Sequence, residues 1–319
     1  MSTLPQFSPF PGAPPRLGGD GLWRKSFPEF FLVIRPMLLA LFTVGFGLLA
    51  TYRTFGFDLE GGVRDLYPYV ADGWGLWYWL AQAHLDFNTF FCIINLVFAA
   101  QIFVVSFPAQ ERRHSVAVSI MLLLYMALWF LFGQARYGMA LAVLTPAISG
   151  AFPVFILCSG IAILLHKAAA GPVALLLLWR LLNRKKYGLI AAVVICCIFS
   201  YVVSSLAEQV MVLAGYAVYL NWGNLPSANT PLKFYWAIAV LLLWRFRDKQ
   251  TSQPLLILTL ISLPFSYFIV FAGRTFEMYS VLVLYCLART PAPRSVKFLF
   301  LVPYFADLGN LLFNSGFYF

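Results

Sequence analysis

The sequence is poor in charge. Asp, Glu, Lys and Arg make up only 11% of its 319 residues, whereas 61% are hydrophobic. A soluble globular chain carries about 25% charged residues, so this chain has too few to cover a water-facing surface. A bilayer removes that need, and the aromatic content of 18% agrees, because Trp and Tyr gather at membrane interfaces. The composition predicts an all-α, polytopic membrane protein.

Several catalytic and binding signatures are also missing. The five cysteines fall within apolar runs and have no zinc or disulfide spacing. No Walker loop, dinucleotide fingerprint or metal-ligand cluster occurs. The net charge of +10 comes in short bursts between apolar runs and not along one basic face, which argues against nucleic acid as a partner. We therefore expect membrane lipids as partners, and neither a metal nor a cofactor.

The apolar runs are numerous enough to cross a bilayer many times. A spanning helix needs about 20 mostly apolar residues, and about eleven candidates occur. They are expected to form one transmembrane domain, 29–319, after a disordered, Pro-rich cytoplasmic tail, 1–28. The stretch 137–165 is compatible with two short helices or with a re-entrant pair. The expected spans are 30–52, 88–107, 115–132, 137–150, 153–165, 168–182, 188–206, 234–245, 255–272, 275–287 and 298–313.

The distribution of Lys and Arg predicts the orientation. If the N-terminus is cytoplasmic, sixteen of the 22 basic residues fall in inner segments and six in outer ones, as the positive-inside rule requires. The first outer loop contains the aromatic run 74–79, which is typical of a short interfacial helix. The six outer basic residues run against the rule, so each calls for a reason.

Arg136 is the first of these outer residues to suggest a function. It stands where a predicted helix enters the membrane from outside, in the sequence Arg136-Tyr137-Gly138. Gly138, Ala140 and Ala142 are small, so neighbouring helices can approach closely there. The simpler alternative is an arginine that extends to the interface from a helix end.

His166 lies at the outer end of one apolar run and the start of the next. Imidazole can take a proton from a hydroxyl near neutral pH, and the adjacent Lys167 would favour its neutral form. This makes His166 a candidate general base. The alternative is an interfacial histidine whose hydrogen bonds are satisfied.

Arg274 and the first outer loop supply the remaining charges. Arg274 lies at an outer helix boundary, where Glu277 could pair with it within one turn. Arg53, Asp58 and Asp65 belong to the loop, where mixed charge is also ordinary for a solvated segment. Taken together, arginines distant in sequence and one histidine fall on one membrane face. Since arginine binds phosphate oxygens with a bidentate fork, they favour a lipid-linked phosphate or diphosphate substrate.

These residues resemble the Wzy-type bacterial polysaccharide polymerases of the EpsG-like branch. The resemblance spans roughly residues 52–279. Two positions depart from the family's pattern: Ala168 stands where Ser or Thr is common two residues after the histidine, and the aromatic run 74–79 stands where Glu is common. The matching residues are Arg53, Gly56, Asp58 and Tyr67 in the first loop, Arg136, Gly138 and Ala140 at a helix start, His166 at a helix end, and Arg274 with Phe276.

The resemblance implies a metal-independent glycosyltransferase of the bacterial inner membrane with a periplasmic active site. Donor and acceptor would be glycans on undecaprenyl diphosphate, and a chain-length regulator is a candidate further partner. His166 would be the base, with Asp58 or Asp65 as substitutes. The diphosphate would be held by Arg136, Arg274 and Arg53. The sugar rings would stack on Tyr67, Tyr216, Tyr219 and Trp222.

Other functions fit the composition as well. A transporter or flippase of lipid-linked glycans would place polar groups near the bilayer midplane on broken helices. Here the predicted helix interiors are nearly free of charge, and the ionisable residues sit at outer ends, which favours an enzyme. A glycan ligase or acyltransferase would share the arginines and differ in its acceptor. A structural subunit of a secretion complex would not need His166 and the arginines.

Overall fold

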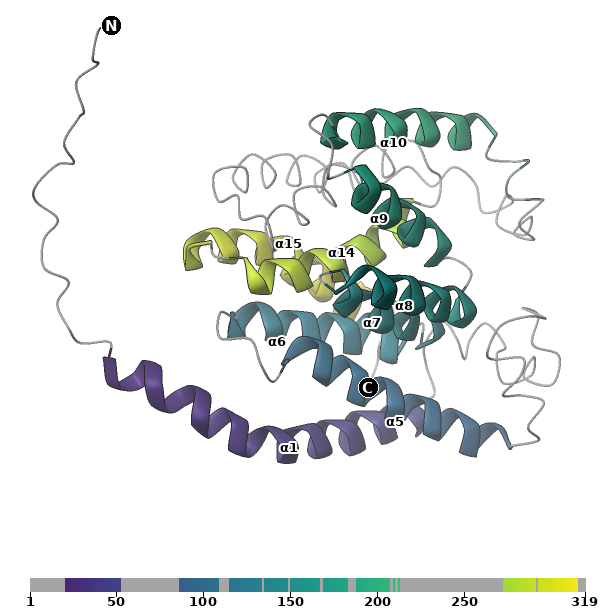
Figure 1. Cartoon of the computed structure of the whole chain (residues 1–319). Coiled ribbons are helices and arrows are strands. Elements are labelled where there is room, and N and C mark those ends of the chain that lie inside the picture. The colour runs from purple at the N-terminus through teal and green to yellow at the C-terminus, as the bar shows by residue number, and fades with distance from the viewer. Residues whose placement is uncertain are drawn as a thin grey trace, which may run out of the picture. The chain divides into compact units, whose positions relative to one another are not determined.

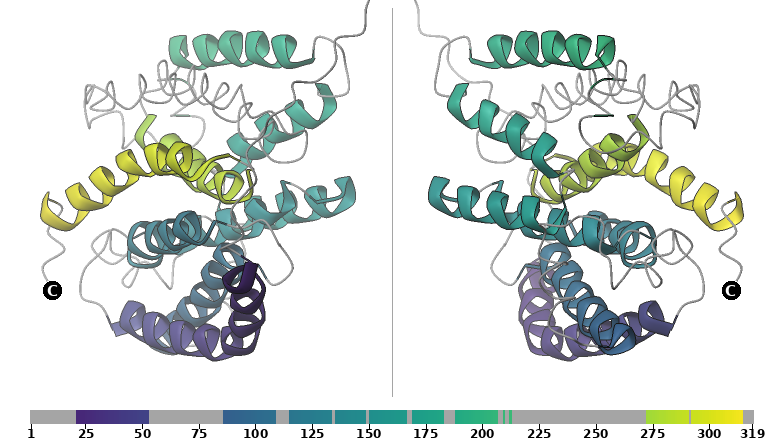
Figure 2. Two further views of the ribbon diagram at one scale, coloured as in Figure 1. Left: turned by 90° about the vertical axis from the view of Figure 1, so that its left-hand side faces the viewer. Right: turned by 90° about the vertical axis from the view of Figure 1, so that its right-hand side faces the viewer.

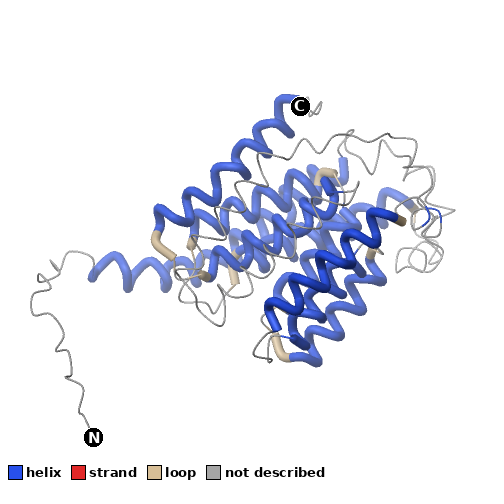
Figure 3. Tube along the Cα trace, turned by 90° about the horizontal axis from the view of Figure 1, so that it is seen from above, coloured by secondary structure: helices blue, strands red, loops and turns tan. Residues whose placement is uncertain are grey.

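The computed structural model describes residues 21–52, 86–108, 115–133, 135–148, 150–166, 169–182, 188–206, 209, 212, 272–290 and 292–314. Every regular element among them is a helix, as predicted, and Figure 3 shows no strand in this part of the chain. The helices are α1 (Gly21–Tyr52), α5 (Phe87–Ser106), α6 (Val116–Tyr125), the π-helix η2 (Met126–Leu131), α7 (Ala135–Ala147), α8 (Phe152–Leu165), α9 (Ala170–Leu182), α10 (Gly188–Ser205), α14 (Ala272–Arg289) and α15 (Arg294–Asn314).

Two of the described helices are long and apolar enough to cross a membrane, Val33–Tyr52 and Asn88–Ser106. Shorter apolar helices cover Val116–Leu131, Phe152–Leu165 and Ser280–Arg289. The interfacial helix predicted near residues 74–79 lies outside the described residues.

The chain divides into two compact units, Met1–Leu38 and Leu39–Phe319. Within the second unit, α14 lies at the centre of the core. All its side chains from Val281 to Ala288 are buried, as expected for a helix that is surrounded on every side. The largest fully buried side chains around it include Tyr125, Phe130 and Leu141, from α6, η2 and α7.

Large apolar side chains also cover much of the outside of the second unit. On α8, Leu157 is 65% exposed, and on α10, Ile190 is 64% exposed. Contiguous apolar surface of this kind is typical of faces that contact lipid or another protein. Other members of these faces are Val154, Ile156, Ile161 and Leu164 on α8, and Val194, Ile195, Ile198 and Val202 on α10.

The directions of α6, α14 and α15 follow from their contacts. At one level, the Ser115 amide donates to the Ala288 carbonyl at 3.0 Å. At another, the Tyr304 hydroxyl donates to the Ser280 carbonyl at 3.0 Å, and the Tyr304 ring lies 5.4 Å from that of Tyr125. From the first level to the second, residue numbers fall along α14 and rise along α6 and α15. Helix α14 is therefore antiparallel to both.

The stretch 137–165 forms two helices, α7 and α8, joined by a tight turn in which the Gly150 amide donates to the Ala147 carbonyl at 3.1 Å. These helices pack closely against each other, and Figures 1 and 2 show the pair between α5 and α9. Gly138 of α7 is buried, and a Cβ at this position would collide with the ring of Phe98 and with Cβ of Phe130. The prediction that small residues allow close helix approach at Gly138 is therefore confirmed.

Candidate functional site

Arg136 and His166 lie at the same end of the α7–α8 hairpin. Arg136 is the second residue of α7, and His166 is the residue that ends α8. The two helices are antiparallel neighbours, so the start of α7 meets the end of α8. The His166 ring lies 5.1 Å from the ring of Tyr137, centroid to centroid. The structure thus places two residues that are thirty positions apart in the sequence at the same end of one hairpin.

The backbone around His166 explains how its ring comes to this end. His166 has an extended conformation, with φ −155° and ψ 121°, so the chain leaves the helix there. Its amide still donates to the Ala162 carbonyl at 2.9 Å, and its carbonyl accepts from the Ala169 amide at 2.9 Å. Both backbone groups are thus satisfied, and the side chain is half-buried.

Aromatic contacts fix the position of the histidine ring further. Tyr137 is buried, and its ring lies 5.8 Å from that of Phe130 in η2. A series of ring contacts therefore runs from Phe130 in the π-helix through Tyr137 to His166. In η2 the Phe132 amide reaches back to the Ala127 carbonyl, which widens the turn just before α7 begins. Single π-turns of this kind occur frequently at functional sites.

Arg274 is the third residue of α14. Ser280 is level with Tyr125, as the contacts of Tyr304 show. Arg274 precedes Ser280 by six residues of α14, which is about 9 Å at 1.5 Å per residue. Going from Ser280 to Arg274 follows the same direction as going from Tyr125 through η2 to the start of α7. Backbone position 274 therefore lies toward the end of the bundle that holds Arg136.

The other predicted site residues lie outside the described part of the chain. These are Arg53, Asp58, Asp65, Tyr67, Tyr216, Tyr219 and Trp222. Among the described residues, no group of three or more His, Cys, Asp and Glu side chains could hold a metal ion.

Arg180 closes the opposite end of the same hairpin, a role that the sequence analysis missed. Its Nη2 donates to the carbonyl oxygens of Ala147 at 2.8 Å, Ile148 at 2.6 Å and Gly150 at 2.9 Å. Its guanidinium carbon lies 4.5 Å from the centre of the Phe155 ring. Arg180 thereby satisfies carbonyls that the end of α7 leaves without helical partners. No sequence signal links residue 180 to residue 147, so only the tertiary structure reveals this contact.

Comparison with models of known protein families, with curated proteins and with solved structures finds no match to this chain. Function is therefore inferred from the residues themselves.

Proposed function

We propose that this chain is a membrane glycosyltransferase that polymerises oligosaccharide repeat units carried on undecaprenyl diphosphate. The product would be a surface polysaccharide such as O-antigen, capsule or exopolysaccharide. The reaction would occur at the periplasmic face of the inner membrane, at the end of the α7–α8 hairpin that holds Arg136 and His166.

One observation carries the proposal: Arg136 and His166, both half-buried, share that end. A guanidinium supplies paired donors that match phosphate oxygens. An imidazole supplies a base whose ordinary pKa lies near neutrality. A substrate that carries both a diphosphate and a reacting hydroxyl would use both groups at once.

The proposed reaction is a displacement at the anomeric carbon of the donor glycan. An acceptor hydroxyl oxygen forms a bond to that carbon while the bond from the carbon to the diphosphate oxygen breaks. The hydroxyl proton passes to His166, and the lipid diphosphate leaves with the bonding electrons. Because negative charge grows on the leaving group, a fixed arginine lowers the barrier. Arg274, and Arg53 from the first loop, are the further candidates for this role.

The membrane setting rests on composition and surface. We propose about eleven spanning helices, in line with one helix per apolar run, with the N-terminus in the cytoplasm. Support comes from the two long apolar helices and from the apolar outer faces of α8 and α10. In this orientation the Arg136 end of the hairpin faces outward and Arg180 lies inward.

A reconstitution assay tests the proposal. The full chain is purified, mixed with lipid-linked repeat units in detergent, and the products are separated by length. We expect glycans of two or more repeats, no requirement for a metal, and loss of product in Arg136→Gln and His166→Ala. Lys167→Gln is the matched control, since it removes a neighbouring charge and no base.

Two results would overturn the proposal. Full-length product from both Arg136→Gln and His166→Ala would show that these residues do not form the active site. Transfer of the glycan to a different acceptor, or its movement across vesicles without elongation, would instead identify a ligase or a transporter.

A further inference from the structure

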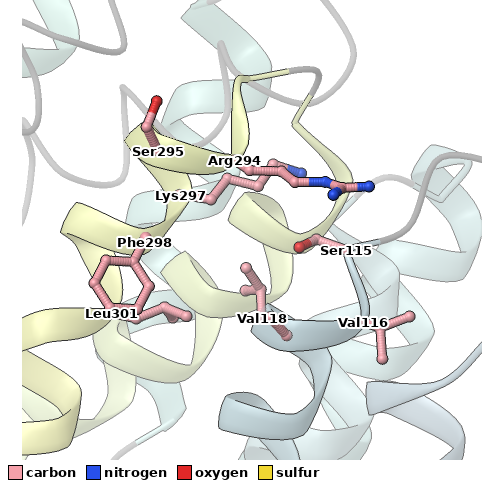
Figure 4. A pocket seen from close by; sticks show the side chains of 9 residues that line it. Ser115, Val116, Val118, Arg294, Ser295, Lys297, Phe298 and Leu301 are labelled. Carbon is pink, nitrogen blue, oxygen red and sulfur yellow. The ribbon is translucent and has the colours of Figure 1, made fainter.

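A second charged region lies where α6 and α15 begin. A cavity of about 630 Å³ opens there. Its lining comes from the start of α6 and the first two turns of α15 (Figure 4). The residues that line it are Ser115, Val116, Ala117, Val118, Arg294, Ser295, Lys297, Phe298 and Leu301.

Lys297 places a buried ammonium in this cavity. The residue is only 8% exposed, and its Nζ donates to the Ala288 carbonyl at 3.3 Å. An ammonium has three donors, and this carbonyl engages one of them. Within the described residues no carboxylate pairs with it, and burial lowers the pKa of Lys297 to about 8. Because a buried charge is costly unless paired, an anion in the cavity would stabilise the protonated form.

Arg294 adds a second cation on the same helix, one turn from Lys297. Arg294 is exposed. In the view of Figure 4, its side chain and that of Lys297 reach toward the end of α6 that carries Ser115. Both cations lie in the first four residues of α15, where the helix macrodipole disfavours positive charge. The dipole of α15 therefore does not explain their position.

The start of α6 adds backbone donors to the same cavity. Ser115 precedes the helix, and its side chain makes no capping hydrogen bond. The first amides of a helix have no partner within the helix, and they carry partial positive charge. Residues 116–118, which contain these amides, line the cavity. Two cationic side chains and one helix start thus converge on one space.

Apolar side chains form the rest of the wall. Phe298 is 62% exposed and Val116 is 48% exposed, while Leu301 and Val118 are buried. In Figure 4 these four lie below the two cations. The cavity is therefore cationic on one side and apolar on the other, as a ligand with an anionic head and a hydrocarbon body requires.

We propose that this cavity binds one anionic phospholipid, with the phosphate against Arg294, Lys297 and the start of α6, and an acyl chain along Phe298 and Leu301. The inference rests on the membrane location in the proposed function, but not on its chemistry. The apolar wall selects a lipid over a free phosphate. The sequence also places Arg112 and Arg113 just before α6, and such juxtamembrane basic residues attract anionic lipids.

The experiment uses the full chain purified in a zwitterionic detergent. Dioleoyl phosphatidylglycerol and dioleoyl phosphatidylcholine are titrated separately, and native mass spectrometry counts the bound lipids and gives their affinities. We expect one tight phosphatidylglycerol site that phosphatidylcholine does not fill. Arg294→Gln combined with Lys297→Gln should weaken that site by at least about tenfold, because the phosphate loses its charge-assisted hydrogen bonds to both side chains. Arg294→Lys, which keeps the charge, should retain most of the affinity.

Two results would overturn the inference. Unchanged phosphatidylglycerol affinity in the double variant would show that the lipid does not bind in this cavity. Displacement of the lipid by millimolar inorganic phosphate would identify a site for a free anion. If Lys297→Gln does not fold, Arg294→Gln alone gives the answer, since Arg294 is exposed. Polymerisation is not measured, so this inference and the proposed function can fail separately.

Discussion

The two ends of the α7–α8 hairpin hold arginines in opposite helical settings. Arg180 lies in the last turn of α9 and donates to carbonyls at the end of α7, where the helix dipole favours a cation. Arg136 lies in the first turn of α7, where the same dipole disfavours one. Arg180 therefore has a sufficient structural reason for its position, whereas Arg136 has a cost that another benefit must offset.

The same contrast applies to the other described cations of the second unit. Arg289 lies in the last turn of α14 and donates to the Tyr285 carbonyl at 3.0 Å. Its guanidinium carbon lies 3.4 Å from the centre of the Tyr285 ring. Arg274, Arg294 and Lys297, in contrast, belong to first turns. We infer that cations in last turns stabilise their own helices, whereas cations in first turns do not, although Lys297 donates to the Ala288 carbonyl in the last turn of α14.

The largest expected effect concerns His166, the proposed base at the Arg136 end. His166→Ala should lower turnover about 10²–10⁴-fold, the usual contribution of a general base. Donor binding should change little, because the proposed site binds the donor through its arginines. Product formation and donor affinity are measured on the purified variant. Reduced membrane levels with normal turnover per molecule would make His166 a packing residue, and Asp58 and Asp65 would become the candidate bases.

Arg136 offers a sharper test of the contrast, because activity and stability should move in opposite directions. Arg136→Gln should lower turnover about 10²–10³-fold, as loss of a transition-state donor does. It should also stabilise the start of α7 by about 0.3–1 kcal/mol, since the dipole no longer opposes a charge. Turnover and thermal unfolding are compared in one preparation.

Arg136→Lys serves as the control for charge, because it keeps the cation and loses the fork. It should remain impaired in turnover without the gain in stability. A marked loss of stability in Arg136→Gln would contradict the contrast and make this arginine structural.

Arg180 should behave in the opposite way. Arg180→Ala removes donors from three carbonyl groups, so we expect a loss of about 2–4 kcal/mol in stability with near-normal turnover per folded molecule. Thermal unfolding in detergent and specific activity give the two numbers. Arg180→Lys should recover only part of the stability. The lysine ammonium can still donate to the carbonyls, but it cannot stack on Phe155 as the guanidinium does. A specific activity that falls with unchanged stability would place Arg180 in the site.

The helices could be predicted from the sequence because the apolar runs themselves set their length. The expected span 153–165 corresponds to α8, Phe152–Leu165, and 88–107 to α5, Phe87–Ser106. Local signals explain these starts: Pro153 suits the first turn of a helix, and Asp86 accepts from the amides of Asn88 and Thr89. The alternation of helices predicted Arg136 and His166 at one end, as the hairpin has them.

Other features could not be predicted, for physical reasons. An apolar run ends at charged residues, but a helix can continue through them. The predicted span 298–313 therefore omitted the first turn of α15, which begins at Arg294. That turn carries Arg294 and Lys297, the two cations that line the cavity. The π-helix at Met126–Leu131 has no signal in its apolar sequence. The bond from Arg180 to Ala147 depends on how α9 packs, which no local pattern encodes.

The smallest expected effect is the pH dependence of Lys297. Burial lowers its pKa from 10.5 to about 8 in the folded chain, so above pH 8 the unfolded chain holds more protons than the folded one. Stability should then rise with pH between about 8 and 10.5 and be flat below 8, because both states are protonated there. From pH 7.5 to 8.5 the gain should stay below about 1.4 kcal/mol, the most that one proton contributes per unit. Arg294 is the other cation that lines the cavity, and Lys297→Met should remove the rise. Bound phosphatidylglycerol should move this rise in stability to higher pH, since an anion favours the ammonium.

Thermal unfolding across this range, with and without the lipid, measures both shifts. A slope that persists in Lys297→Met would assign the titration to another group and remove Lys297 as a sensor of the lipid.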